Sequence, residues 1–396
     1  MTTTAVKRLT IYPLAIPMKR RISHAASQRA VSEPIVAAVE LMGGAIGYGE
    51  TLPRPYVTGE SNESVIELLR GEFVKQLLAI RPVTFFDAIE AIDALPFLTE
   101  QGLPCPAARA CLELALLDAY LREAGRSVSD CVGWMDLPAF GPPGSTQTIR
   151  YSMVLASESP ESLARTARVA HLFGMRHFKL KVGFADDDAR IQAVLKFIGR
   201  TLATGRGTLR LDANGAWSME QALGQLQRWR DLPIAAIEQP LAKGAEHELL
   251  ALVGAGGAPI YHDESLTTIE DAEHLHELGV AGGFNIRISK CGGLLPTIRL
   301  AAFARQRDIG IQLGCMVGET SILSAAQARV LECVPGVRFV EGGFGRLLMA
   351  DDVTKRVVHF GLGGRPPRLS PNGLGAEVLR ERIERHLIDK PIVIEL

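Results

Sequence analysis

The chain has 396 residues with a balanced charge, 43 basic against 44 acidic side chains. Such a balance excludes the strongly basic surface of nucleic-acid-binding proteins, so we expect no nucleic-acid partner. No stretch reaches the roughly 18 uncharged apolar residues that a membrane span needs, and the first residues do not resemble a signal peptide. We therefore expect a cytoplasmic protein that acts on small molecules and has no membrane partner.

The first part of the chain alternates between strand-like and helical patterns, which predicts an α+β domain over residues 1–130. The strand-like stretches are residues 8–16, 33–42 and 45–52, and the helical stretches are residues 60–80 and 104–124. Gly43 and Gly44 are typical of a turn between the second and third strands. We expect the second helix to be amphipathic and to end at Gly125.

From Ile149 onward, short apolar strands alternate with helices, the pattern of a parallel sheet with helical crossovers. Eight strands are predicted, at residues 149–156, 177–183, 208–215, 234–241, 259–266, 283–290, 310–315 and 337–343. Eight such units predict a closed (β/α)8 TIM barrel rather than an open sheet, with the barrel domain at residues 131–345. We expect residues 346–396 to return to the N-terminal domain.

Charged side chains recur at or just past the ends of six of these strands. They are Lys181, Asp212, Glu238, Asp263, Lys290 and Glu319. Each is about one strand and one helix beyond the previous one, so all of them should meet at the mouth formed by the carboxyl ends of the strands.

Asp212, Glu238 and Asp263 would then be three carboxylates from three consecutive strands. Taken singly, each has an alternative role as the N-cap of the next helix. Three anions at one site repel one another unless a cation lies between them, and oxygen ligands favour Mg²⁺ or Mn²⁺ over zinc. The sequence therefore predicts a divalent metal site.

Lysines flank this centre on both sides, Lys179 and Lys181 before the carboxylates and Lys290 after them. Strand order places Lys181 and Lys290 on opposite faces of a substrate held at the metal, an arrangement suited to proton transfer. Lys179 would lower the pKa of Lys181 by like-charge repulsion. The alternative for Lys179 and Lys181 is an anion-binding or solvated pair at a strand end.

Taken together, these motifs resemble the enolase superfamily, in particular its muconate lactonizing enzyme subgroup. The matching motifs are K-x-K at 179–181, D-x-N at 212–214, EQP at 238–240, DES at 263–265, SKCGG at 289–293, GYGET at 47–51 and PNGLGAEV at 371–378. The resemblance spans essentially the whole chain. It implies a modified TIM barrel whose N-terminal α+β capping domain is completed by the C-terminal segment.

The resemblance also implies roles for individual residues. Asp212, Glu238 and Asp263 would bind Mg²⁺, and Lys181 and Lys290 would be the acid/base pair. The groups that would contact the substrate are Asn214, Glu264 and Glu319, with Arg21, His24, Arg54 and Tyr56 from two capping-domain loops. Asn214 has an alternative role as a turn residue, and Glu319 has one as the charge at a helix N-terminus.

The resemblance implies removal of the α-proton of a small carboxylate to give a metal-stabilised enolate. We favour a cycloisomerase, because the Asp-x-Asp that dipeptide epimerases carry after the eighth strand is replaced here by VEGGFG, with only Glu341. Racemisation or epimerisation of an N-acylated amino acid and syn-dehydration, as in o-succinylbenzoate synthase, are the alternatives. Schiff-base chemistry at Lys181 or Lys290, or a non-catalytic metal-binding scaffold, are hypotheses of other classes. We expect a homo-oligomer.

Overall fold

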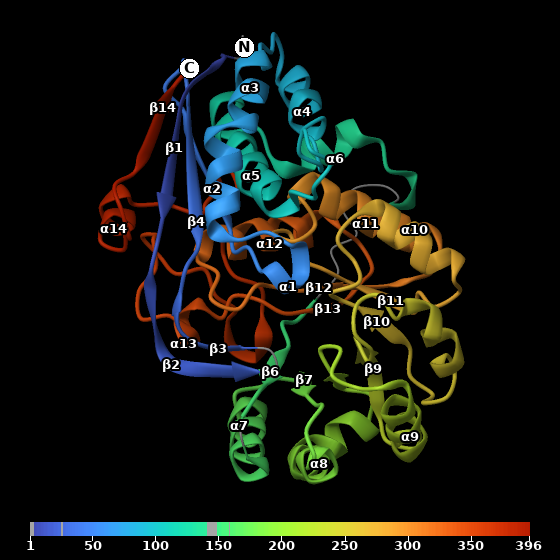
Figure 1. Ribbon diagram of the computed structural model, residues 1–396. Helices are drawn as coiled ribbons and strands as arrows, with labels where there is room; N and C mark the ends of the chain where they lie inside the picture. The colour runs from blue at the N-terminus through green and yellow to red at the C-terminus, as the bar shows by residue number, and fades with distance from the viewer. Residues whose placement is uncertain (1–3, 25–26, 141–148, 158) are drawn as a thin grey trace.

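The protein is described from a computed structural model. It describes residues 4–24, 27–140, 149–157 and 159–396, with only the backbone described for residues 20–24 and 27–29. Figure 1 shows two parts, a sheet with helices at the top and a barrel below. No helix in the described ranges is long and apolar enough to cross a membrane.

The N-terminal part is built on a four-stranded sheet in the order β14-β1-β4-β5. Its strands are β1 (Val6–Pro13), β4 (Ile35–Leu41), β5 (Ile46–Thr51) and β14 (Ile392–Glu395), and β2 (Ile16–His24) and β3 (Ser27–Ser32) form a separate hairpin. The helices are α1 (Pro55–Thr58), α2 (Asn62–Arg70), α3 (Glu72–Ala79), α4 (Phe85–Asp93), α5 (Pro106–Ala124) and α6 (Val128–Met135). Because β14 pairs antiparallel with β1, the C-terminal segment returns to this domain as expected.

Helix α5 lies at the centre of this domain and packs directly on β5. A Cβ atom added at Gly47 would lie 2.1 Å from Ala119 N, and one at Gly49 would lie 2.0 Å from Cys111 O. Only glycine therefore allows the helix to approach the strand this closely. The prediction that α5 is amphipathic was wrong, since every residue from Pro106 to Leu121 is buried. Its polar residues are paired inside the protein instead of facing solvent.

The second part is an eight-stranded parallel barrel in the order β6 to β13, as predicted. The strands are β6 (Met153–Leu155), β7 (His177–Lys181), β8 (Thr208–Asp212), β9 (Ile234–Glu238), β10 (Ile260–His262), β11 (Gly283–Ile286), β12 (Gly310–Leu313) and β13 (Val337–Val340). The barrel closes through a parallel bridge between Tyr151 and Val340, where Ser152 N donates to Val340 O at 2.8 Å.

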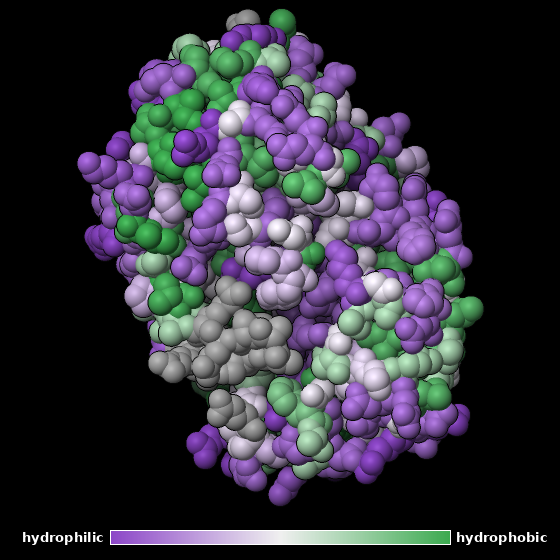
Figure 2. All heavy atoms as spheres, in the orientation of Figure 1, coloured by the Kyte–Doolittle hydropathy of each residue, from purple (hydrophilic) through white to green (hydrophobic). Residues whose placement is uncertain are grey.

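Helices surround the barrel and cover its outer face (Figure 1). They are α7 (Pro160–Leu172), α8 (Asp187–Ala203), α9 (Met219–Trp229), α10 (Ile269–Glu277), α11 (Leu294–Gln306), α12 (Ser321–Cys333) and α13 (Gly345–Leu348), with 3₁₀ helices η1 (Pro138–Phe140), η2 (Glu246–Leu252) and η3 (Leu362–Gly364). The late helix α14 (Arg380–Glu384) lies instead against the N-terminal domain, where its Ile383 shares a buried cluster with Tyr12 and Val36. After β9 the crossover is the 3₁₀ helix η2. On the side of the molecule that Figure 2 shows, the residues at the bottom, where Figure 1 places α8, are mainly hydrophilic.

The fold class predicted from the sequence is confirmed, down to the position of all eight barrel strands. The helical pattern of residues 60–80 is two helices, because the chain breaks at Gly71. The β2–β3 hairpin was not predicted. The domain boundaries at residues 130 and 345 stay predictions.

Carboxylates of the N-terminal domain cap barrel helices. Glu113 on α5 accepts hydrogen bonds from Leu294 N at 3.0 Å and Leu295 N at 2.8 Å, the first backbone donors of α11. The N-cap of α11, Gly293, has no capping side chain and a φ of 126°, and a Cβ atom there would lie 2.5 Å from the Glu113 carboxyl carbon. Glu113 thus does the capping, and Gly293 leaves room for it.

We expect Glu113→Leu to lower the free energy of unfolding by about 2 to 4 kcal/mol, because two buried backbone donors lose their acceptor. Urea unfolding of the variant beside wild type measures this loss. The exposed Glu90→Gln is the control and should change little. A Glu113→Leu protein as stable as wild type would contradict the capping role.

Glu113 also predicts a dependence of stability on pH. Burial raises the pKa of its carboxyl from 4.5 to about 7. The folded chain then binds this proton more tightly than the unfolded chain. The stabilisation that the protonated Glu113 gives to the folded state is therefore complete below pH 4.5 and is lost as the pH rises through about 7. Unfolding free energies at pH 5 and pH 8 should differ less in Glu113→Gln than in wild type, and equal differences would contradict the assignment.

Candidate active site

Three of the predicted site residues lie side by side at the ends of neighbouring strands. In the parallel register Lys181 on β7 is opposite Asp212 on β8, and Asp212 is opposite Glu238 on β9. Asp212 and Glu238 are fully buried, while the Lys181 side chain keeps about 19% of its surface exposed. The sheet itself therefore brings these side chains into one layer at the barrel mouth.

Lys179 lies one layer deeper and contacts three carboxylates. Its Nζ is 2.9 Å from Asp212 Oδ2, 3.1 Å from Glu238 Oε1 and 2.6 Å from Glu341 Oε2. Burial opposes its charge, but the attraction of the three carboxylates raises the pKa of the Lys179 ammonium above its usual value. Lys179 is thus a buried cation that holds the carboxylates together. Its predicted effect on Lys181 stays a prediction.

Lys181 is held by two neighbours on β8 and the turn after it. Its Nζ donates to Asp212 Oδ2 and to Asn214 Oδ1, both at 2.6 Å. Asn214 has a φ of 46°, as a turn residue often does, and it also donates from Nδ2 to Glu264 Oε1 at 3.2 Å. Asn214 therefore has the turn role and contacts two predicted site residues, while its contact with a substrate stays a prediction. Burial, with Asp212 nearby, raises the pKa of Glu264.

Lys290 and Asp263 form the other side of the mouth. Lys290 Nζ is 3.1 Å from Asp263 Oδ1 and donates to Leu266 O at 2.6 Å, and Arg287 pairs with Asp263 Oδ2. Burial lowers the pKa of Lys290 to about 8. Lys290 follows β11, which is four places from β7 in the eight-stranded order, so the two lysines come from opposite sides of the barrel.

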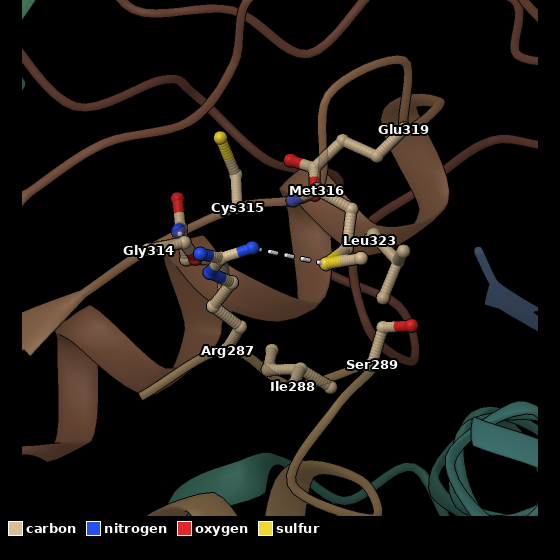
Figure 3. Close-up of a pocket in the computed structure, with 9 residues that line it drawn as sticks. Arg287, Ile288, Ser289, Gly314, Cys315, Met316, Glu319 and Leu323 are labelled. Carbon is tan, nitrogen blue, oxygen red and sulfur yellow. Dashed lines mark hydrogen bonds between the residues drawn. The ribbon is translucent and has the colours of Figure 1, made fainter. Parts of the chain in front are cut away.

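Glu319 lies at the N-terminal end of α12, beside a cavity with room for about one water molecule, roughly 10 Å³. Figure 3 shows Arg287, Met316 and Glu319 around this cavity, with Arg287 Nη1 hydrogen-bonded to Met316 Sδ. Glu319 accepts from Met316 N at 3.1 Å and from Ser324 Oγ at 3.0 Å. Burial, with Glu50 nearby, raises the pKa of Glu319 to about 8. Its position fits both the polar role at the site and the helix-terminus role.

Of the four candidates from the capping domain, only Arg54 and Tyr56 have side chains that the structure describes. Arg54 is buried and donates to Pro53 O at 3.0 Å and Val317 O at 3.3 Å, which ties its loop to the loop after β12. Tyr56 on α1 is exposed. The side chains of Arg21 and His24 lie outside the described residues. Substrate contact by these four residues stays a prediction.

Two buried residues that sequence reasoning left without a role complete the charge arrangement. Arg210, two residues before Asp212 on β8, pairs with Glu341, which directly follows β13. Lys179 and Arg210 together lower the pKa of Glu341 against the effect of its burial. The alternation of strand side chains could have identified Arg210 as inward-facing, because it lies on the same face of β8 as Asp212.

Glu238 also has two neutral partners. Asn285 Nδ2 donates to Oε1 and Gln312 Nε2 donates to Oε2, each at 2.8 Å. Neither amide was predicted to belong to the site. Both occupy mid-strand positions, where nothing in the sequence distinguishes an inward polar side chain from an ordinary one.

The donor set at the mouth fits Mg²⁺, since three buried carboxylates from consecutive strands supply oxygen ligands. Both Asp263 carboxylate oxygens are paired with cations here, Oδ1 with Lys290 and Oδ2 with Arg287. In the described part of the chain no three His, Cys, Asp or Glu side chains are close enough to bind an ion as they stand. Lysine and arginine side chains pair with the three carboxylates here, so an ion bound by the carboxylates would take the place of these cations.

Residues 162–382 match the family model described as enolase C-terminal domain-like. The chain is similar to the N-succinyl-L-Arg/Lys racemase of Bacillus cereus, with 28% identity over 81% of this chain and 82% of that protein. It is 30% identical to the L-Lys-D/L-Arg epimerase of Methylococcus capsulatus, over 78% of this chain and 81% of that protein. It also resembles the solved structure of muconate lactonizing enzyme from Pseudomonas fluorescens complexed with muconolactone, with a TM-score of 0.80 and 25% identity over 97% and 100% of the two chains.

The buried charges predict a large effect of removing Glu341. We expect Glu341→Leu to lower the free energy of unfolding by about 3 to 5 kcal/mol, because Lys179 and Arg210 would remain buried with too few anions. Chemical unfolding measures this loss. The control is Glu332→Gln, which breaks an exposed ion pair with Arg329 and should cost less than about 1 kcal/mol. Equal losses in the two variants would contradict the proposed charge balance.

Proposed function

This chain belongs to the enolase superfamily and is an enzyme, an isomerase or carbon–oxygen lyase, and on this premise we propose that it transfers the proton α to a substrate carboxylate. Asp212, Glu238 and Asp263 would hold Mg²⁺, with Mn²⁺ as a substitute. The observation that carries the proposal is the placement of Lys181 and Lys290 on opposite sides of these carboxylates. A Schiff-base enzyme or a metal-binding scaffold does not account for both lysines and all three ligands.

Bound Mg²⁺ would stabilise the negative charge that develops on the substrate carboxylate as its α-proton leaves. Lys290 is suited to accept that proton, because burial lets it lose its own proton near pH 8. Lys181 is suited to deliver a proton from the opposite side, and its bonds to Asp212 and Asn214 fix the position of its Nζ. Because the two lysines come from opposite sides of the barrel, a proton removed on one side of the substrate can be replaced on the other, which inverts the carbon.

We propose racemisation or epimerisation of an acylated amino acid or a dipeptide as the overall reaction. The two opposed lysines support it, as do the similar racemase and epimerase. Cycloisomerisation is the second candidate, supported by the missing Asp-x-Asp after β13 and by the similarity to muconate lactonizing enzyme. Syn-dehydration is a third possibility of the same chemistry. The homo-oligomeric state and the cytoplasmic location stay predictions.

The metal requirement is tested by removing divalent ions. Exchange of the substrate α-hydrogen with D₂O should stop after treatment with a chelator and return with Mg²⁺ or Mn²⁺, because the carbanion charge has no other counter-ion of this strength. Addition of Ca²⁺ after chelation is the comparison. Full exchange in an ion-free preparation would contradict the proposal.

The two-base arrangement is tested by removing one lysine at a time. With each enantiomer supplied separately, Lys181→Ala and Lys290→Ala should each lose α-hydrogen exchange from a different enantiomer and keep it from the other. Lys196→Ala, on the exposed surface of α8, is the control and should retain both. Loss of all exchange in one mutant and none in the other would favour the cycloisomerase candidate.

In Lys181→Ala, Lys290 is the remaining base, and its pKa predicts how the rate of exchange depends on pH. Only the neutral amine accepts a proton, so exchange in Lys181→Ala should rise about tenfold per pH unit below pH 8 and level off above it. Rates measured from pH 6 to pH 9.5 test this. A profile that is flat over this range would exclude Lys290 as the base.

A further inference from the structure

Glu238 is the predicted ion ligand with the largest number of neutral donors around it. We propose that Asn285 and Gln312 are positioning residues that hold the Glu238 carboxylate in its ion-binding orientation and thereby set the affinity for Mg²⁺. The inference rests on the proposed function, because it concerns the same metal site. It adds two residues to which neither the sequence motifs nor the comparisons assign a role.

The two amides reach Glu238 from distant strands. Glu238 ends β9, whereas Asn285 is on β11 and Gln312 is on β12, where the two are direct partners in the parallel register. Their donors contact different oxygens of the carboxylate, Nδ2 of Asn285 on Oε1 and Nε2 of Gln312 on Oε2, both at 2.8 Å. Two bonds to two oxygens prevent the carboxylate from rotating about its terminal bond.

All three side chains are almost completely inaccessible to solvent, so water cannot replace these bonds. The chain also makes room for Asn285, since a Cβ atom at Gly314 would lie 2.2 Å from Asn285 Oδ1. Among the described residues, Asn285 Oδ1 and Gln312 Oε1 have no hydrogen-bond partner. Buried unpartnered oxygens reduce stability. The bonds to Glu238 therefore explain why these two amides are buried here, because their own oxygens are not paired with other groups in the described part of the chain.

Neutral donors suit an ion ligand better than cations do. Lys179 also approaches Glu238, at 3.1 Å, but its positive charge repels a divalent ion bound to the same carboxylate. The amide groups carry no net charge and can stay bonded to Glu238 whether or not the ion is there. Lys179 Nζ also donates to the second oxygen of Glu238, Oε2, at 3.3 Å. An ion bound to Glu238 would therefore take the place of Lys179 and leave both amide bonds intact.

The test is calorimetric titration of the ion-free protein with MgCl₂, which does not depend on activity. We expect Gln312→Met and Asn285→Leu to raise the Kd for Mg²⁺ about 10- to 100-fold. Gln327→Met is the matched control. Gln327 is also a buried barrel amide, but it donates to the backbone carbonyls of Gly314 and Glu341, so its removal should leave the Kd within twofold of wild type.

Circular dichroism and the melting temperature of each ion-free variant establish that it is folded, and the smaller Gln312→Ala replaces Gln312→Met if the latter does not fold. A Kd unchanged from wild type in the folded Gln312 and Asn285 variants would overturn the inference while leaving the proposed function intact. An equal loss of affinity in Gln327→Met would also overturn it, because the effect would then be one of general packing. If wild type itself bound no Mg²⁺ or Mn²⁺, the proposed function and this inference would both be wrong.

Discussion

Charge balance inside the barrel is the constraint on which the site and much of the fold depend. Asp212, Glu238 and Glu341 are buried within reach of one ammonium group, that of Lys179. Ionised carboxylates in such surroundings repel one another strongly, so the structure requires cations among them before any substrate arrives. Lys181 supplies a further cation at Asp212, and Arg210 supplies another by pairing with Glu341. A residue that resembles a catalytic lysine in the sequence is thus also a structural one.

Much of the site could be predicted because a parallel barrel repeats. Lys181, Asp212 and Glu238 are far apart in the sequence, yet the register pairs each with the next. Repetition of one strand and one helix brings every strand end to the same mouth, so the position of a charge within its unit is enough to place it. The eight strands were located from the same repetition.

The remainder depends on contacts that no local pattern encodes. Asn285 and Gln312 reach Glu238 across the inside of the barrel, and such pairs are defined only once the sheet has closed. Helix α5 was misread for a related reason. An amphipathic helix would turn its charged residues to solvent, whereas the Glu113 side chain is buried against the first turn of α11. A polar residue in a sequence indicates that a partner is needed, but not whether the partner is water or protein.

The pairing of β14 with β1 has a consequence for synthesis of the chain. Arg8 and Glu395 are neighbours in this sheet although 387 positions separate them. On the ribosome, β1 emerges before the barrel and before β14, so its outer edge stays without this partner until residue 395 has left the ribosome. The intervening barrel can begin to fold in that interval. An unpaired strand edge readily joins strands of other nascent chains, so the speed of translation through the barrel determines how long this domain is open to misassembly.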